Sequence, residues 1–296
     1  MSAGFPRQHV PARSVAWCLW GLLIAGGFPQ SSVWMTVAHS QEPDTVQPRP
    51  SPADVQRLFG KQVFQGESGA TLPYRLLAPP PTSDSDVDRR YPLVLFLHGA
   101  GERGQDNERQ LVHAAAEFAR PERRQAYPAY VVFPQCPKET KWVLSPWEKQ
   151  DGTGTFPEQP SEPLALALEL VTSLQRTLPI DDDRVYVTGL SMGGYGSWYA
   201  AGHSPDRFAA MLAVCGGGDP EWAGRYQGVS VWAFHGDADP TVPVQRSRQM
   251  ISALALAGHQ PELRYVEYPG VGHDSWTRTY ARQDVFAWLF SKRRSQ

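Results

Sequence analysis

The chain contains little of what marks several classes of protein. Three cysteines occur among its 296 residues, and only Cys136 and Cys215 lie beyond residue 40. The 28 lysines and arginines nearly balance the 30 acidic residues, and no basic patch suited to nucleic acid is present. The sequence also lacks a dinucleotide-binding glycine fingerprint and metal-ligand spacing. These absences predict a protein with no metal, no cofactor and no nucleic-acid partner.

Two states remain open for the cysteines beyond residue 40. In an oxidising compartment, Cys136 and Cys215 could form a disulfide. Each follows a separate apolar run, however, and sequence alone does not place their Cα atoms within bridging range. Two buried free thiols are the alternative.

Residues 1–40 have the pattern of a secretory signal peptide. No acidic residue occurs before Glu42, and two arginines precede a short apolar stretch at residues 15–24. Ala38 and Ser40 supply the small residues that a signal peptidase recognises, so we expect cleavage after Ser40 and a secreted or periplasmic protein. An uncleaved membrane anchor is the alternative, but the apolar stretch is too short to span a bilayer comfortably. We therefore expect no stable membrane span once the signal is removed.

The rest of the chain divides into a short linker and one domain. Residues 41–60 are rich in proline and polar side chains, which predicts an extended linker without a core of its own. Residues 61–296 have the length of one large α/β domain.

Apolar runs alternate with helical patterns from residue 61 onward. Residues 62–65 and 74–77 flank a glycine-containing connection and predict an antiparallel hairpin. The alternation predicts an α/β fold with a mostly parallel sheet and helices on both faces, whose ligands lie at the carboxyl ends of the strands. Further strands are expected at residues 93–97, 130–133, 185–187, 208–214, 231–234 and 263–268, and helices at residues 108–120, 162–178, 195–201, 245–257 and 277–290.

A Gly-x-Ser-x-Gly sequence at residues 189–193 lies between a predicted strand and a predicted helix. In this context the pattern predicts a nucleophile elbow, a sharp turn that lifts the hydroxyl of Ser191 above the sheet. Glycines flank the serine because a Cβ at those positions would collide with neighbouring backbone. We therefore expect Ser191 to be a nucleophile, and the alternative is a glycine-rich turn with an incidental serine.

A serine hydroxyl needs a base to take its proton and a third group to orient that base. When the nucleophile lies on such an elbow, the acid and then the histidine follow it along the chain. His273 follows the last predicted strand and is the expected base. Asp239 is the expected acid, with Asp237 as its rival because both follow the same strand. His98 and His235 lie at strand ends and are expected to be buried structural histidines bonded to backbone.

The tetrahedral intermediate of ester cleavage needs N–H donors for its oxyanion. Met192 follows the nucleophile at a helix N-terminus, so its N–H is the first expected donor. The second donor is expected from the loop at residues 98–101, where Ala100 is our choice and Gly101 the alternative.

Trp142 and Trp147 lie in a long irregular segment, residues 138–160, near the predicted active face. Their rings could line an acyl or sugar pocket, which makes both tryptophans candidate substrate contacts. Core anchoring of the segment is the alternative.

Four segments together resemble one family: LHGAGERG at residues 97–104, FPQCP at 133–137, DRVYVTGLSMGGYG at 183–196 and HGDADPTVP at 235–243. The chain is similar over about residues 64–290 to secreted esterase-like α/β-hydrolases that are often called predicted peptidases. These are akin to feruloyl and acetylxylan esterases, phospholipase/carboxylesterases and dienelactone hydrolases. The resemblance implies an α/β-hydrolase fold and matches Ser191, Asp239 and His273 to the family's catalytic triad.

These features predict a secreted serine hydrolase that cleaves carboxylic esters through an acyl-enzyme intermediate. The expected substrate is a small-molecule or carbohydrate-linked ester. Two alternatives remain: a serine peptidase or amidase that uses the same residues, and a catalytically silent carbohydrate-binding module built on a hydrolase fold.

Overall fold

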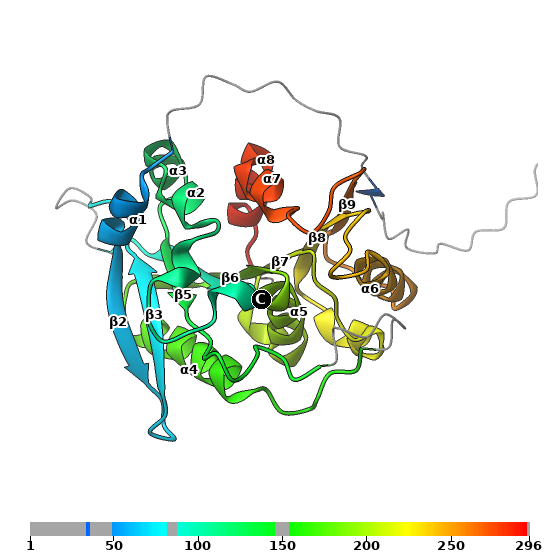
Figure 1. The fold of residues 1–296 in the computed structure, drawn as a ribbon, viewed down its shortest axis with the longest axis horizontal. Coiled ribbons are helices and arrows are strands. Elements are labelled where there is room, and N and C mark those ends of the chain that lie inside the picture. Colours follow the sequence, from blue (N-terminus) through cyan, green and yellow to red (C-terminus); the bar gives the residue numbers. More distant parts are fainter. Residues whose placement is uncertain (1–33, 36–48, 82–87, 146–153, 295–296) are drawn as a thin grey trace, which may run out of the picture. The chain divides into compact units, whose positions relative to one another are not determined.

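A mostly parallel sheet organises the computed structural model, which describes residues 34–35, 49–81, 88–145 and 154–294 (Figure 1). All of them belong to one unit, Ser31–Gln296. The strands are β1 (Trp34–Met35), β2 (Phe59–Gln65), β3 (Thr71–Leu77), β4 (Tyr91–Leu97), β5 (Tyr130–Pro134), β6 (Ile180–Leu190), β7 (Ala210–Val214), β8 (Ser230–Gly236) and β9 (Leu263–Tyr268). The helices are α1 (Pro52–Leu58), α2 (Ala115–Ala119), α3 (Pro121–Ala126), α4 (Glu162–Thr177), α5 (Met192–His203), α6 (Gln245–Leu256), α7 (Trp276–Ala281) and α8 (Gln283–Phe290). Short 3-10 helices lie at η2 (Ala100–Glu102), η3 (Arg109–Leu111), η4 (Pro205–Arg207) and η5 (Pro220–Tyr226).

The strands lie in the order β1-β9-β8-β7-β6-β4-β5-β3-β2. In this spatial order, all neighbouring pairs from β1 as far as β5 are parallel. Strand β3 pairs antiparallel with both β5 and β2. The predicted hairpin and the predicted parallel sheet are both confirmed. Because β4, β6, β7, β8 and β9 run in the same direction, the loops that follow them meet at one edge of the sheet.

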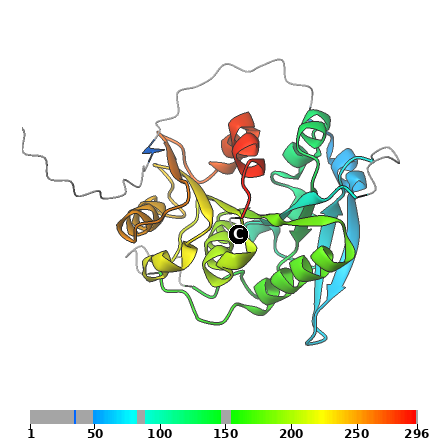
Figure 2. The same ribbon diagram turned by 180° about the vertical axis from the view of Figure 1, so that it is seen from behind.

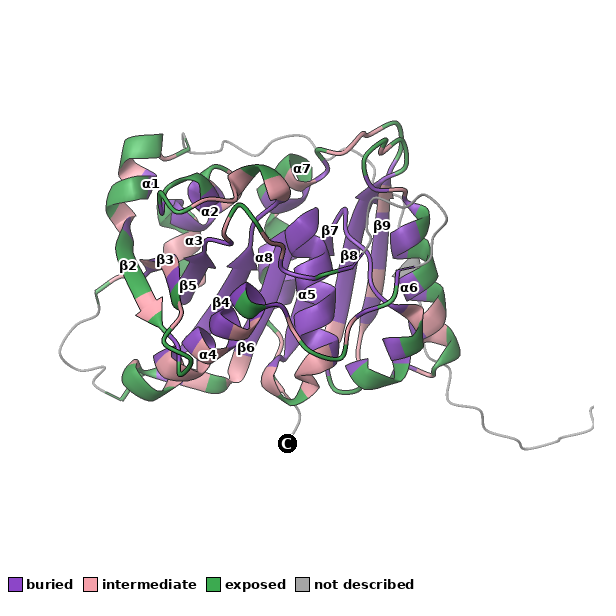
Figure 3. Cartoon of the chain, turned by 60° about the horizontal axis from the view of Figure 1, so that its bottom comes forward, coloured by how far each residue is buried: buried purple, intermediate pink, exposed green. Residues whose placement is uncertain are grey.

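Two hydrophobic layers cover the sheet. Buried side chains of α4, α5 and α6 pack on one face, and those of α1, α2, α7 and α8 pack on the other (Figures 1 and 2). Strand β4 is buried along its whole length, as expected of a strand that is covered on both faces (Figure 3).

The linker predicted at residues 41–60 is wrong in its second half, where α1 forms. The Ser51 hydroxyl accepts a hydrogen bond from the Asp54 N–H at 3.2 Å, and the Asp54 carboxylate accepts one from the Ser51 N–H at 3.3 Å. This capping box, with Pro52 at the first helical position, is a helix start rather than a linker feature. Val55 and Phe59 then bury the segment in the core.

Two predicted helices are each divided in the structure. Residues 112–114, of which Ala114 has a φ of 62°, separate η3 from α2 inside the expected helix at residues 108–120. Arg282 is extended and separates α7 from α8. Its guanidinium donates to the Asp284 carboxylate at 2.9 and 2.6 Å, and that acid lies in the first turn of α8, where it favours a new helix start.

Most of the predicted signal peptide, residues 1–40, lies outside the described residues. Only Trp34–Met35 of this segment is described, as strand β1 beside β9. Within the described ranges, none of the helices has both the length and the apolar character that a membrane crossing requires.

The turn from β6 into α5 leaves no room for side chains on its glycines. A Cβ at Gly193 would overlap the Leu97 carbonyl oxygen, and one at Gly194 would lie 2.7 Å from the Val214 carbonyl oxygen. The first turn of α5 therefore contacts the backbone at the ends of β4 and β7 directly.

We predict that Gly193→Ala destabilises the protein, because the added methyl group must push α5 away from β4. The free energy of unfolding, measured with urea, should fall by about 3 kcal/mol. Gly224→Ala is the control, since no atom lies within 4 Å of a Cβ at that position. Equal stability of the two variants would contradict the close approach.

Candidate active site

Ser191 occupies the turn between β6 and α5. Its φ of 53° and ψ of −119° lie outside the conformations that residues with a side chain usually adopt. The Ser191 N–H donates to the Val214 carbonyl at 2.9 Å, and α5 begins at the next residue. Strain of this kind persists only where the surrounding structure enforces it, as the packing of α5 does here.

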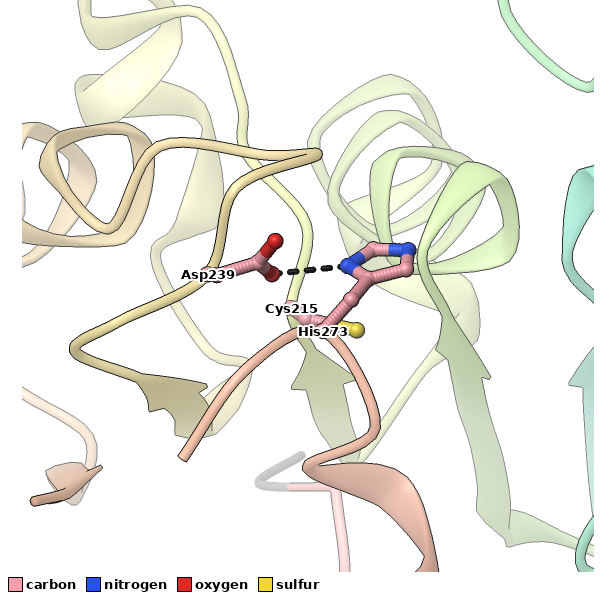
Figure 4. Close-up of side chains that lie close together, drawn as sticks. All are labelled: Cys215, Asp239 and His273. Atoms are coloured by element: carbon pink, nitrogen blue, oxygen red, sulfur yellow. Dashed lines mark hydrogen bonds and ion pairs between the residues drawn. The ribbon is translucent and has the colours of Figure 1, made fainter. Parts of the chain in front are cut away.

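The imidazole of His273 lies between Ser191 and Asp239. Its Nε2 is 2.9 Å from the Ser191 Oγ. Its Nδ1 is 2.7 Å from the Asp239 Oδ2 (Figure 4). An ionised carboxylate can only accept, so we assign the ring proton to Nδ1. Nε2 is then the acceptor for the serine hydroxyl proton. The structure therefore brings together the three residues that the sequence selects.

The side chain of Asp239 is buried, yet it is held as a carboxylate. Burial opposes its ionisation, but hydrogen bonds from His235, His273 and the Val242 and Thr241 amides outweigh burial and keep its pKa well below the ordinary value. The two amides donate to Oδ1 at 3.0 and 2.8 Å, which leaves Oδ2 for the imidazoles.

The other two aspartates near this histidine hold the loops. Asp237 Oδ1 accepts the Gly270 N–H at 2.7 Å, which links the loop after β8 to the loop that carries His273. Asp274 accepts from the N–H and the hydroxyl of Thr277 at 3.0 and 2.9 Å, at the start of α7. Asp237, the rival candidate for the acid, therefore bonds a loop amide, and Asp239 is the carboxylate that contacts His273.

Cys215 lies beside this pair, with its Sγ and ligand atoms of Asp239 and His273 all within 4.8 Å of one another (Figure 4). Three such groups could in principle hold a metal ion. Burial raises the pKa of the Cys215 thiol, however, and the other two groups already bond each other. We therefore assign no metal here. Cys136 is also buried, and both cysteines are free thiols.

The loop after β4 lies against Ser191, the expected nucleophile. A Cβ at Gly99 would be 3.7 Å from the Ser191 Cβ. The Gly99 carbonyl accepts from the His98 ring Nδ1 at 2.6 Å, and the Ala100 carbonyl accepts from Arg103 Nε at 3.0 Å. The Gly99 carbonyl and the Ala100 N–H belong to one peptide plane and point in opposite directions. Because the Gly99 carbonyl is bonded to the buried His98 ring, the Ala100 N–H points away from that ring.

His98 has a defined tautomer. The Cys136 N–H donates to its Nε2 at 2.9 Å, so that nitrogen carries no proton and Nδ1 donates to the Gly99 carbonyl. Burial lowers the pKa of His98 to about 4, which keeps the ring neutral. A second proton would set two donors against each other and would loosen the loop.

Trp142 belongs to the core rather than to a substrate surface. Its side chain is fully buried, and its Nε1 donates to the His98 carbonyl at 3.0 Å. Trp142 therefore anchors its segment in the core, which is the alternative given above for this residue. Its hydrogen bond to the His98 carbonyl also restrains the loop after β4, in addition to the bonds made by His98 and Arg103. Trp147 lies outside the described residues.

Trp276 contacts His273, the expected base, and the sequence did not identify this tryptophan as part of the site. Its indole meets the His273 ring edge-on, at 5.2 Å between centroids and 88° between planes. His113 packs on the same indole at 5.2 Å. The sequence feature that could have indicated this contact is a tryptophan three residues after the expected base, at the start of a helix. Its contact depends on how the loop folds back, which sequence periodicity does not show.

A family sequence model and a curated relative both match this chain and are both described as esterases. A sequence model of the family described as "Putative esterase" matches residues 75–279. The chain is 30% identical over 179 residues to "Putative esterase NocK" of Nocardia uniformis subsp. tsuyamanensis, covering 60% of this chain and 47% of that protein. It is 24% identical over 239 residues to an "Uncharacterized secreted protein" of Arthroderma benhamiae, covering 69% and 24%. The chain thus spans about half or less of these curated relatives.

Solved structures share the fold. A thermostable esterase superposes with a TM-score of 0.73 at 37% identity, covering 81% of this chain and 64% of that one. A ferulic acid esterase of Anaeromyces mucronatus, solved with ferulic acid, gives 0.57 at 15% identity, covering 85% and 93%. An acylaminoacyl peptidase of Pyrococcus horikoshii gives 0.55 at 17% identity, covering 79% and 41%. The last two show the fold alone, and the predicted α/β-hydrolase fold is confirmed.

We predict that His98 weakens the protein in acid. An unfolded histidine binds a proton below about pH 6.5, whereas folded His98 does so only near pH 4, so the free energy of unfolding falls as pH is lowered through this window. Between pH 7 and pH 4.5 the wild type should lose about 2 kcal/mol more than His98→Gln, as measured with urea at each pH.

His259 provides a second test in the same window, since burial lowers its pKa to about 4 as well. The double variant His98→Gln/His259→Gln should therefore show the smallest loss of stability in acid. If the free energy of unfolding of the wild type and of His98→Gln changed in parallel with pH, His98 would not be held neutral.

Proposed function

The chain belongs to the esterase family whose sequence model it matches, and on that premise we propose that it is a secreted serine hydrolase that cleaves carboxylic esters. The observation that carries the proposal is the hydrogen-bonded line from Ser191 Oγ through His273 to Asp239, with links of 2.9 and 2.7 Å. The line stands at the carboxyl edge of the parallel sheet, where such folds bind ligands.

The geometry supports a two-step reaction. Ser191 Oγ attacks the ester carbonyl carbon while its proton passes to His273 Nε2, and the imidazolium that forms is stabilised by Asp239. The tetrahedral intermediate collapses to an acyl-enzyme, and His273 gives the proton to the leaving alcohol. Water then repeats the sequence, with His273 again as the base, and releases the acid.

The oxyanion of each tetrahedral intermediate is assigned to two backbone donors. Met192 follows the nucleophile at the N-terminus of α5, where its N–H has no partner within the helix. The Ala100 N–H belongs to the loop that lies against Ser191. Three side chains restrain that loop through its carbonyls: Trp142, His98 and Arg103. Such prior restraint is what lets donors stabilise charge without reorganising.

Secretion and substrate class are also part of the proposal. The sequence pattern of residues 1–40 supports export, and one relative from Arthroderma benhamiae is called a secreted protein. A small-molecule or carbohydrate-linked ester is the expected substrate class. The ferulic acid esterase with the same fold supports a search among feruloyl and acetyl esters.

We predict that Ser191→Ala abolishes hydrolysis of p-nitrophenyl acetate, with a loss of about 10⁶-fold in kcat, because no other group supplies the nucleophile. Labelling by a fluorophosphonate probe should disappear in the same variant. Ser173→Ala on α4 is the matched control and should keep both. Turnover by folded Ser191→Ala would end the proposal, and cleavage of peptide substrates without ester cleavage would replace it with a peptidase.

We predict that Ala100→Pro lowers kcat by about 100- to 1000-fold with little change in KM, because proline removes only the proposed oxyanion donor. Ala100 is the first residue of η2, and Gly99 before it is extended, so proline fits the backbone there. Ala100→Gly keeps the N–H and is the control. Full activity of the proline variant would transfer the role to another donor, such as the Gly101 N–H.

A further inference from the structure

A second histidine lies on the other side of the buried carboxylate. His235 is near the end of β8 and is fully buried. Its Nε2 is 3.3 Å from Asp239 Oδ2, the same oxygen that His273 contacts at 2.7 Å. Asp239 is therefore contacted by two imidazoles from different strand ends.

The proton on the His235 Nε2 follows from its neighbours. Besides the carboxylate, Nε2 lies 2.9 Å from the Val242 carbonyl oxygen. Both neighbours are acceptors, so Nε2 must carry a proton. On the other side of the ring, Nδ1 is 2.8 Å from the Ser247 Oγ, which in turn is 3.0 Å from the Gly216 carbonyl oxygen. The Nε2 proton is required whichever way that hydroxyl turns.

We propose that His235 is a positioning residue for Asp239, so that the working unit is a line of four side chains from Ser191 through His273 and Asp239 to His235. The proposal rests on the hydrolase function above. His235 holds Oδ2 through Nε2 while the Thr241 and Val242 amides hold Oδ1, which prevents the carboxylate from rotating away from His273. Ser247 on α6 fixes the ring from behind.

The neighbouring loop gives this arrangement little freedom. A Cβ at Gly236, directly after His235, would overlap the carbonyl oxygens of Val271 and Gly272. The Ala238 N–H donates to the same Val271 carbonyl at 3.1 Å. The loop that carries the base thus lies directly on the strand end that carries His235 and on the loop that carries the acid.

The titratable and charged groups around His235 come from four segments. Asp239 and Asp237 lie on the loop that follows β8, and Glu267 is its register partner on β9. Arg248 of α6 binds the Glu267 carboxylate through two hydrogen bonds of 2.7 and 2.6 Å. His273 faces the shared oxygen from the loop after β9. Asp239 is the member of this set that both histidines contact.

The proposal predicts a change in the protonation of His273. Without the His235 donor, the Asp239 charge is shared with fewer hydrogen bonds and attracts the His273 proton more strongly. His235→Phe keeps a flat ring but removes the donor. The midpoint of the His273 titration, followed by NMR of its ring protons, should rise by at least about 0.5 pH unit. The acid limb of the kcat/KM profile should move with it, and kcat/KM should fall about 10- to 100-fold.

Three further variants make the test specific. His235→Gln places an amide donor near the position of Nε2 and should return the titration midpoint and most of the activity. Ser247→Ala keeps the His235 ring but removes its hydrogen bond to Ser247, so the His273 midpoint should shift in the same direction by a smaller amount. This variant provides the test if His235→Phe does not fold. His259→Phe replaces a buried histidine outside the site and should leave the midpoint unchanged.

The outcomes are distinguishable from failure of the hydrolase function itself. The NMR titration reads the coupling between the imidazoles and the carboxylate whether or not an ester is cleaved. An unchanged His273 midpoint in folded His235→Phe, or in folded Ser247→Ala, would overturn the positioning role. An inactive wild type with the predicted shifts would overturn the hydrolase function and leave the positioning role supported.

Discussion

The close packing of α5 on the ends of β4 and β7 is the constraint on which the site depends. No side chain separates Gly193 from the Leu97 carbonyl or Gly194 from the Val214 carbonyl. The chain must therefore reverse within one residue, which forces Ser191 to a φ of 53°. The same contact places the loop after β4 beside the serine. One backbone packing arrangement thus places Ser191, the loop after β4 and the N-terminus of α5 beside one another.

Polar side chains then hold the surrounding loops through backbone groups. The carbonyls of His98, Gly99 and Ala100 each accept from a side chain. The loops that carry the acid and the base are joined by Asp237 and by the contact at Gly236. Because Trp142 and His98 meet the carbonyls of His98 and Gly99 in the buried interior, each of those two peptide planes has one orientation. These hydrogen bonds restrict the motion of the loops that form the site.

The sequence predicts those parts of the structure that depend on local pattern. Continuous apolar runs identify β4 and β7, and the spacing of glycines around Ser191 identifies the elbow. The helix α1 was missed because the prolines near it resemble a linker, although Ser51 and Asp54 form a capping box. The breaks at Ala114 and Arg282 have no counterpart in the apolar periodicity of the sequence, and the burial of Trp142 depends on a contact with His98 that is distant in sequence. The contact of His235 with Asp239 appears only when the loop closes over the strand end.

Three histidines near this sheet edge show how one side chain takes different roles. His98 faces one donor and one acceptor, both from backbone, so it is neutral and serves as a rigid link. Nε2 of His235 faces only acceptors, so that nitrogen holds its proton and serves as a donor. His273 lies between a carboxylate and a hydroxyl, which can give up a proton and take it back. In the proposed reaction, proton transfer falls to His273 because its hydroxyl partner is Ser191, whereas His98 holds the neighbouring backbone and His235 contacts the Asp239 carboxylate.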